Sequence, residues 1–193
     1  MDINAVAERL DSLPAEEQVE ILALLDELNA ARSRGLAQDD FLEFVKLVWP
    51  AFIEGNHHRT MADAFNRIAN GDLKRLIINM PPRHTKSEFA SHLFPAWYLG
   101  RFPDRKVIQT AHTAELAVGF GRKVRNLVGS PDYHNIFPDV SLSTDSKAAG
   151  RWNTNKNGDY FAIGVGGAVT GKGADILIVD DPHSEQEAAL NDP

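Results

Sequence analysis

The sequence contains no cysteine. Disulfide bridges and thiolate metal sites are therefore excluded. No apolar run reaches the length of about 20 residues that a membrane-spanning helix needs, so we expect no membrane partner. Residues 1–4 are acidic and lack the basic-then-apolar pattern of a secretory signal. The sequence also lacks internal repeats and low-complexity tracts, and its 193 residues suffice for one domain with a substantial core.

Positive charge is not in excess either. The chain carries 20 basic and 27 acidic side chains, a net charge of −7. Residues 1–54 hold 12 acidic and 4 basic side chains, whereas residues 55–193 hold 15 acidic and 16 basic ones. Proteins that grip nucleic acid through general electrostatics carry a strong basic patch or stripe. If the protein works on DNA, its main contact is therefore expected to be local, transient or elsewhere.

What is present is an alternation of strand and helix signals. Apolar runs predict strands at 75–80, 106–111, 160–165 and 175–180. Helical periodicity and end signals predict helices at 14–34, 39–49, 60–70, 86–99 and 113–128. Residues 130–159 are rich in small polar residues and favour loop. This order predicts an α/β fold with a mainly parallel sheet flanked by helices, with an N-terminal helical region at 1–54 and a core at 55–193.

The helix expected at 14–34 carries one apolar stripe, formed by Ile21, Leu24, Leu25 and Leu28. Gly35 is expected to end this helix. The favoured interpretation is that the stripe packs on the chain's own domain. A helix that binds a partner is the alternative.

The loop after the first expected strand resembles a phosphate-binding loop that lacks its glycines. The pattern G-x-x-x-x-G-K-[ST] would place glycine at Met80 and Thr85. Backbone N–H groups at a helix N-terminus, together with a lysine, neutralise a polyphosphate. Lys86 would then reach the β- and γ-phosphates, Ser87 would bind Mg²⁺, and Arg83 would add a second cation near the γ-phosphate. The alternative is a solvated basic turn.

A carboxylate pair follows the last expected strand. Asp180 and Asp181 lie at its C-terminal end, which is where α/β proteins bind their ligands. Asp180 would hold Mg²⁺, and Asp181 would polarise the attacking water, a role that glutamate fills more often. An acidic turn before Pro182 is the alternative. Together, the two halves predict a site for a nucleoside triphosphate and Mg²⁺.

Five segments together resemble a known family. They are residues 76–88, 94–100, 121–125, 170–175 and 178–182. The chain resembles the N-terminal ATPase part of the large terminase subunit of tailed bacteriophages, from about residue 40 to its end. The resemblance implies a P-loop ATPase fold in which ATP hydrolysis drives double-stranded DNA through a portal into a procapsid.

The resemblance also implies roles for particular residues and partners. Nucleotide binding falls to Pro82, Arg83, His84, Thr85, Lys86 and Ser87, catalysis to Arg83, Lys86 and Asp181, and Mg²⁺ binding to Ser87 and Asp180. The expected partners are double-stranded DNA, the procapsid portal and a small terminase subunit, with a homo-oligomeric ring for the full-length protein. The expected location is the host cytoplasm, transiently at the portal and not in the mature virion.

The sequence patterns around several other residues are less specific, so their roles are assigned more weakly. The region that would match the family's adenine-binding segment is Asn56–Arg59, although it holds no glutamine. Arg122 or Arg125 could act on a neighbour's nucleotide, with a solvated basic face as the favoured alternative. His84 and His183 flank the proposed site, where capping or exposure is their expected role. Trp152 and Tyr160 are expected to anchor the core or a loop rather than to stack on bases.

Only 12 residues follow Asp181. In ATPases of this group the strand between the two motif strands comes later in the chain, and the family's nuclease follows it. We therefore expect an incomplete ATPase domain without nuclease activity, whether as the front of a larger protein, a split gene product or an expressed fragment. Exposed apolar surface, weak stability, dimerisation or altered strand order should follow. A non-catalytic assembly fragment, or a small-molecule kinase, remains the alternative function.

Overall fold

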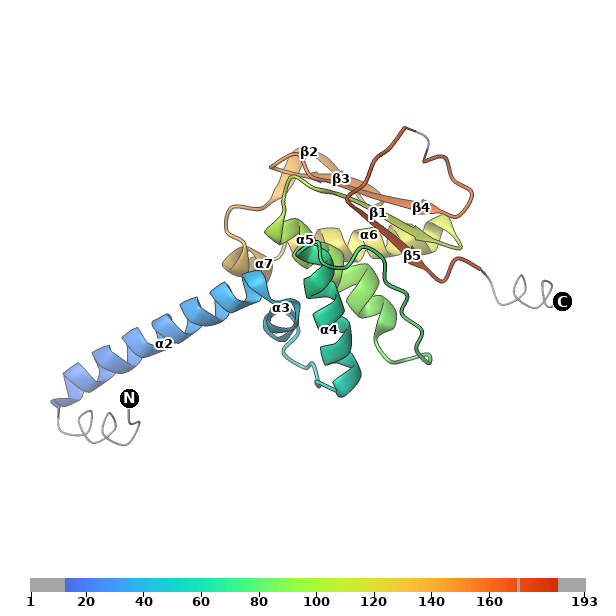
Figure 1. The fold of residues 1–193 in the computed structure, drawn as a ribbon. Coiled ribbons are helices and arrows are strands. Elements are labelled where there is room, and N and C mark those ends of the chain that lie inside the picture. Colours follow the sequence, from blue (N-terminus) through green and yellow to red (C-terminus); the bar gives the residue numbers. More distant parts are fainter. Residues whose placement is uncertain (1–12, 170, 184–193) are drawn as a thin grey trace.

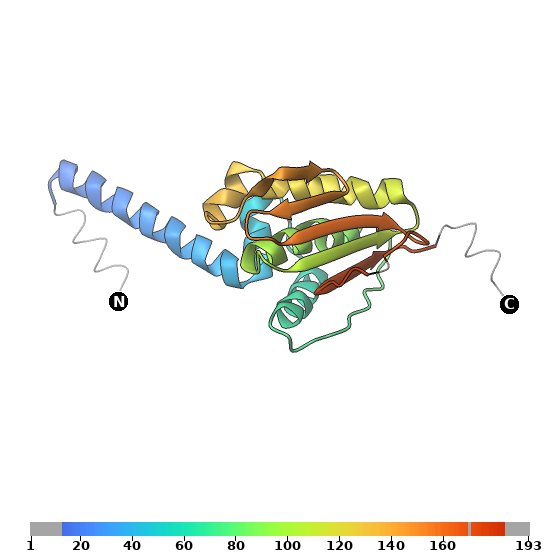
Figure 2. The ribbon, with the colours of Figure 1, turned by 90° about the horizontal axis from the view of Figure 1, so that it is seen from above.

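A mixed five-stranded sheet with helices packed on it forms the body of the molecule. The computed structural model describes residues 13–169 and 171–183. The sheet has the order β2-β3-β4-β1-β5. Its strands are β1 (Lys106–Ala111), β2 (Leu142–Ala148), β3 (Arg151–Thr154), β4 (Asp159–Gly164) and β5 (Ile176–Asp180). Figures 1 and 2 show the sheet above a layer of helices, with one helix projecting away from both.

The helices follow the expected order with shifted ends. They are α2 (Ala15–Asp39), α3 (Phe41–Val48), α4 (Asn56–Ala69), α5 (Phe94–Arg101), α6 (Ala114–Val128) and α7 (Pro131–Ile136). A π-helix, η1 (Glu88–Leu93), leads directly into α5. The carboxylate of Asp40 caps α3 by accepting from the Glu43 N–H at 3.0 Å. No helix in the described part of the chain is both long and apolar enough to cross a bilayer.

Three expectations about the sheet are wrong. Residues 75–80 form no strand, since a strand requires a hydrogen-bonded neighbour and, among the described residues, β5 pairs only with β1. The sheet is mixed rather than mainly parallel, because β3 runs antiparallel to both β2 and β4. Residues 130–159 are not mostly loop, because they form α7, β2 and β3. In β3 only alternate residues are buried, which leaves its sequence too polar to look like a strand.

Two expectations about α2 are also wrong. The helix runs through Gly35 to Asp39, so Gly35 does not end it. Among the residues of the stripe, Leu24, Leu25 and Leu28 are exposed, so this stripe does not pack on the domain. Only the last turns of α2 contact the body, where the Trp97 indole N–H donates to the Ala37 carbonyl at 3.0 Å. Ala37 is the buried residue of this helix.

Aromatic side chains join the helices beneath the sheet. Phe41 is fully buried at the centre, with its ring 5.1 Å from that of Phe65, 5.4 Å from Phe89 and 5.6 Å from Trp97. These contacts link α3, α4, η1 and α5 into one core. Because Phe89 follows Ser87 by only two residues, the core holds the start of η1, and with it the end of the loop at 81–87.

Of the two expected places for Trp152 and Tyr160, core or loop, the structure shows the core. Both are fully buried, and their rings stack with centroids 5.0 Å apart. The Trp152 indole N–H donates to the carbonyl of Gly121 at 3.2 Å, which fixes α6 over β3 and β4. Gly121 allows this close approach because a Cβ there would lie 2.5 Å from the Ala149 carbonyl oxygen.

The glycines of α6 provide a matched test of this packing. Gly121→Ala should lower the free energy of unfolding by about 1–3 kcal/mol, because the added methyl overpacks the contact with the β2–β3 turn. Gly119→Ala lies in the same helix with no atom near its Cβ, so it should stabilise by roughly 0.5–1 kcal/mol. Urea unfolding measures both. Shifts in the same direction for the two variants would contradict this packing.

Candidate functional site

The loop at residues 81–87 contains two non-glycine residues in the left-handed backbone region. Arg83 has φ 63° and Thr85 has φ 61°. This conformation is sterically unfavourable for residues that carry a Cβ, and most of all for a β-branched one. The chain therefore adopts at Thr85 the kind of backbone that glycine supplies in the usual phosphate loop. Such strained residues gather at functional sites when surrounding contacts hold them in place.

His58 supplies that contact for Thr85. The Gly55 N–H donates to His58 Nδ1 at 2.9 Å, so the ring proton resides on Nε2. Nε2 then donates to Thr85 Oγ1, 2.8 Å away, and the Thr85 hydroxyl donates to the His84 carbonyl at 2.6 Å. Phe52 and Phe89 enclose the His58 ring, with centroids 4.8 and 4.9 Å away. Burial lowers the pKa of His58, which favours the neutral ring that this hydrogen bonding needs.

Asp180 is the buried carboxylate of the site. It lies at the end of β5 and is only 6% exposed. Ser87 Oγ donates to its Oδ1 at 3.1 Å, and Ser91 Oγ donates to its Oδ2 at 2.8 Å. Gln109, fully buried on β1, donates from Nε2 to Ser91 Oγ at 3.2 Å. A buried carboxylate is stable only when hydrogen-bonded, so these donors fix both oxygens of Asp180.

Lys86 and Asp181 form an ion pair at the mouth of the site. Lys86 Nζ lies 2.7 Å from Asp181 Oδ1. Asp181 has φ 42°, a third left-handed non-glycine residue, and its side chain is 63% exposed. An exposed pair of this kind contributes little to stability, so a polyphosphate could draw Lys86 away at small cost.

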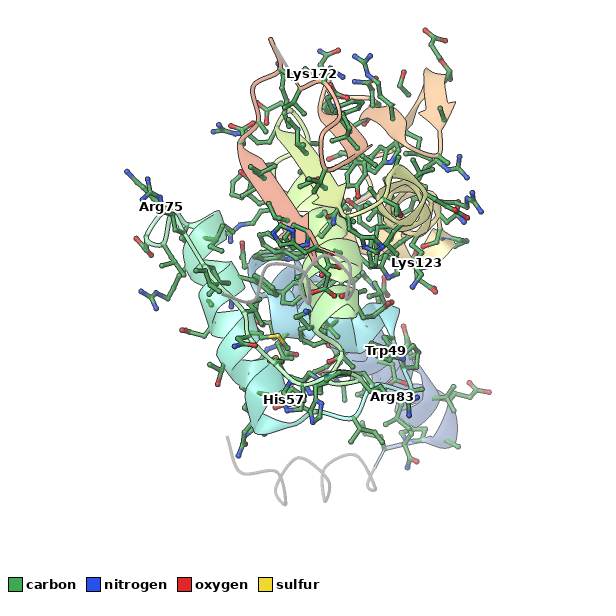
Figure 3. The ribbon with its side chains drawn as sticks, turned by 90° about the vertical axis from the view of Figure 1, so that its right-hand side faces the viewer. Trp49, His57, Arg75, Arg83, Lys123 and Lys172 are labelled. Carbon is green, nitrogen blue, oxygen red and sulfur yellow. The ribbon has the colours of Figure 1, made fainter. Side chains whose placement is uncertain are left out.

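The structure therefore brings together Lys86, Ser87, Asp180 and Asp181. Lys86 and Asp181, which form the ion pair, are 95 residues apart in the chain. Pro82, Arg83 and His84 are exposed in the loop beside them, and His84 Nδ1 bonds the Pro82 carbonyl at 2.9 Å. His57 lies next to this loop, with its ring 5.9 Å from that of His84. Figure 3 shows His57 and Arg83 at the same end of the molecule, away from Lys172.

Other residues singled out in the sequence lie elsewhere or play other parts. Of Asn56–Arg59, His58 is buried against the loop, while Asn56 and Arg59 are exposed. Arg122 is exposed on α6, and Arg125 hydrogen-bonds Asn126 on the same helix. His183 is exposed.

Sequence reasoning missed Ser91, Gln109 and the role of His58. Ser91 follows Ser87 by four residues, so both face Asp180 from consecutive turns, and this spacing is a readable signal. Gln109 is a polar residue within an apolar strand, which also marks it. The contact between His58 and Thr85 spans 27 residues and has no local signature.

A groove separates β5 from the segment that leads into the loop. Its volume is 720 Å³, with residues 74–78 on one side and 174–182 on the other. Ile77 is 94% exposed, and Leu177 and Val179 on β5 are also exposed. Exposed apolar surface therefore lies beside both motif segments. Lys86 and Asp181 also line this groove.

Residues that could hold a metal ion are already adjacent. The Ser87 hydroxyl and the Asp180 carboxylate are hard oxygen ligands of the kind that Mg²⁺ prefers, and their oxygens lie 3.1 Å apart. The donor set therefore fits Mg²⁺ bound through one carboxylate and one hydroxyl together with phosphate oxygens.

Glu88 clamps the helix that follows the loop. Its carboxylate accepts from His92 Nδ1 at 2.6 Å and from Lys123 on α6 at 3.2 Å. The bond from His92, reinforced by Lys123, lowers the pKa of Glu88 from 4.5 to about 2. A depressed pKa means that the folded state favours the ionised carboxylate.

The hydrogen bonds that Glu88 accepts from His92 and Lys123 predict a contribution to stability that is lost in acid. Above pH 4.5, wild type should be more stable than Glu88→Gln, because the ionised carboxylate binds better in the folded state. The difference should shrink as the pH falls from 4.5 towards about 2, where Glu88 becomes protonated in the folded state as well. Urea unfolding across this range measures it. A difference independent of pH would contradict the assignment.

The contact between His58 and Thr85 predicts energetic coupling. His58→Ala should destabilise wild type by roughly 1–3 kcal/mol, because it removes the partner of the half-buried Gly55 N–H and of the Thr85 hydroxyl. In a Thr85→Gly background the same change should cost less, since glycine adopts positive φ without the support of His58. A double-mutant cycle by urea unfolding should give a coupling of about 0.5–3 kcal/mol.

His57→Ala is the matched control for this cycle. It removes the neighbouring ring without removing the hydrogen bond to Thr85, so its effect should add to that of Thr85→Gly. Equal costs of His58→Ala in both backgrounds would show that His58 does not support Thr85.

Comparison with known proteins finds a similarity to a large terminase subunit. The curated protein "Terminase, large subunit" of Enterobacteria phage T3 is 28% identical over 153 residues, which cover 78% of this chain and 26% of that relative. The chain thus spans about a quarter of the length of the relative it matches. No family model matches the chain, and no solved structure does. The similarity supports a terminase-like relationship at modest identity.

Proposed function

We propose that this chain is the ATP-hydrolysing part of a phage DNA-packaging motor. The observation that carries the proposal is the junction of residues 86–87 with residues 180–181, which sets a lysine, a hydroxyl and two carboxylates at one point. The similarity to a large terminase subunit supports it independently. Phosphoryl transfer from ATP needs a lysine and a hydroxyl that face carboxylates. Here the lysine and the hydroxyl follow a strained loop, and the carboxylates lie at the end of a strand.

Each residue has a distinct role in this proposal. Lys86 would leave Asp181 and bind the β- and γ-phosphates, while the backbone N–H groups of residues 83–87 would surround them. The release frees the carboxylate of Asp181 to orient the attacking water and accept its proton. Arg83, exposed beside Lys86, would offset charge that develops on the γ-phosphate.

Ser87 and Asp180 would hold Mg²⁺. When bound, the ion would neutralise charge on the phosphate oxygens. Asp180 is suited to this role because Ser91 fixes its Oδ2, leaving Oδ1 directed towards Ser87. The hydrogen bond that Gln109 donates to Ser91 keeps that serine hydroxyl oriented.

The wider role follows from the similarity alone. The proposed work of ATP hydrolysis is movement of double-stranded DNA through a portal into a procapsid, in the host cytoplasm. A small terminase subunit and a ring of large subunits would act with the full-length protein. The alternative is a non-catalytic assembly fragment, which the open groove beside β5 favours because apolar surface remains uncovered there.

The first test is ATP turnover by the purified chain. Lys86→Ala should lower phosphate release by about 100-fold or more, because it removes a cation placed at the transferring phosphate. Lys156→Ala is the matched control, since Lys156 is an exposed lysine in the β3–β4 turn. Phosphate release should also require Mg²⁺ and stop when EDTA is added.

Thermal shift with Mg²⁺ and ATP separates the alternatives. Stabilisation by nucleotide with turnover supports the ATPase, and stabilisation without turnover, with or without DNA, supports the assembly fragment. Turnover that survives Lys86→Ala unchanged would show that the site is wrongly assigned.

A further inference from the structure

Helix α2 projects from the domain, and the described residues leave most of its length uncovered. It runs from Ala15 to Asp39 and contacts the body only near its C-terminal end (Figures 1 and 2). There Gln38 donates to the Ile136 carbonyl at 2.5 Å, next to the buried Ala37. The helix upstream of this attachment extends away from the sheet. Isolated surface helices of this kind are stabilised mainly by packing an apolar face against a neighbour.

The α2 stripe, formed by Ile21, Leu24, Leu25 and Leu28, faces away from the body. Leu24, Leu25 and Leu28 are 58%, 40% and 66% exposed. With about 3.6 residues per turn, the four residues fall within a sector of roughly 100°. Ala37 follows Leu28 by nine residues, or about 180° around the helix. A second helix can therefore lie on the stripe without meeting the domain to which α2 is attached.

The stripe is symmetric about its centre. Leu24 and Leu25 adjoin the midpoint, and Ile21 and Leu28 are each the fourth residue outward from it. Glu17 and Arg32, the eighth residues outward, carry opposite charges. Both are exposed and lie on the same sector of the helix as the stripe. When two copies of α2 lie antiparallel, the stripe of one copy is therefore complementary to the stripe of the other.

We propose that α2 is a dimerisation helix that pairs antiparallel with α2 of a second copy of this chain. A two-fold axis at the Leu24–Leu25 bond sets Leu24 against the partner's Leu25, and Ile21 against the partner's Leu28. It also sets Glu17 beside the partner's Arg32 at both ends of the interface. Such an interface is isologous, with the same residues on both sides.

The charges select the antiparallel direction. Parallel pairing would set Glu17 beside the partner's Glu17, and Arg32 beside the partner's Arg32, so that like charges repel. The acidic residues Glu16, Glu17 and Glu20 lie towards the N-terminus of α2, and Arg32 and Arg34 towards its C-terminus. Antiparallel pairing brings these opposite ends together and also opposes the two helix dipoles.

The interface is small, so the dimer is expected to be weak and reversible. Complexes with small interfaces form and dissociate readily. The attachment of each α2 through its C-terminal turn places the two domains at opposite ends of the helix pair. Dimerisation therefore leaves the site around Lys86 and Asp181 accessible in both copies, and it is independent of the proposed ATPase function.

Sedimentation velocity of the full chain, from about 1 μM to about 1 mM, measures the association over the range of weak complexes. Leu28→Glu should weaken dimerisation by about 100-fold, because it buries a charge in the apolar contact. Val19→Glu is the matched control. Val19 is as exposed as Leu28, at 68%, and lies on the opposite side of α2, so dimerisation should be unchanged.

A charge swap tests the direction of pairing. Glu17→Arg and Arg32→Glu should each weaken dimerisation by about 10-fold, because each places like charges together at both ends. The double variant Glu17→Arg/Arg32→Glu should restore wild-type association. Circular dichroism of every variant checks that helix content is kept.

Three results would overturn the proposal. A wild-type chain that is monomeric throughout the concentration range shows that α2 does not pair with itself. Dimers that survive Leu28→Glu show that another surface, such as the groove beside β5, forms the contact. A double charge variant that is as weak as the single ones excludes antiparallel pairing.

Discussion

The buried carboxylate of Asp180 is the constraint on which the arrangement of the site depends. A charge that is 6% exposed must have hydrogen-bond donors, and Ser87 and Ser91 supply them from consecutive turns after the loop. These two bonds tie the end of β5 to the start of η1. Lys86 and Asp181, adjacent to the tied residues, are thereby brought within 2.7 Å of each other. One buried charge therefore joins two segments distant in sequence.

The loop illustrates how a sequence that departs from a motif can keep its backbone. Thr85 occupies a left-handed conformation that glycine adopts freely. The cost is offset by the hydrogen bond from His58, whose ring is held by two phenylalanines and by the Gly55 N–H. At the position where the usual phosphate loop has glycine, this chain has Thr85, and the hydrogen bond from His58 stabilises its backbone conformation. This explains why motif spacing alone leaves nucleotide binding undecided.

Much of the fold was predictable, because β1, β4 and β5 are apolar runs and α3 has an explicit cap. The prediction of a strand at 75–80 was wrong because its apolar residues suit a strand, while strand formation depends on a neighbour far away in sequence. β2 and β3 were not predicted because a half-exposed hairpin carries a polar sequence. In the site, the residues within the two motifs, such as Lys86 and Asp180, could be singled out from the sequence. Ser91, Gln109 and His58 act across the fold, so their roles appear only when the chain is folded.

The proposed function requires Lys86 to exchange Asp181 for the phosphates of ATP while Ser87 and Asp180 remain together at the metal. A crystal structure of the chain with Mg²⁺ and a non-hydrolysable ATP analogue would show whether this exchange occurs. The expected result is Lys86 Nζ on the β- and γ-phosphates, Asp181 released from it, and Mg²⁺ beside Ser87 and Asp180. A nucleotide bound elsewhere, with the ion pair between Lys86 and Asp181 intact, would contradict it.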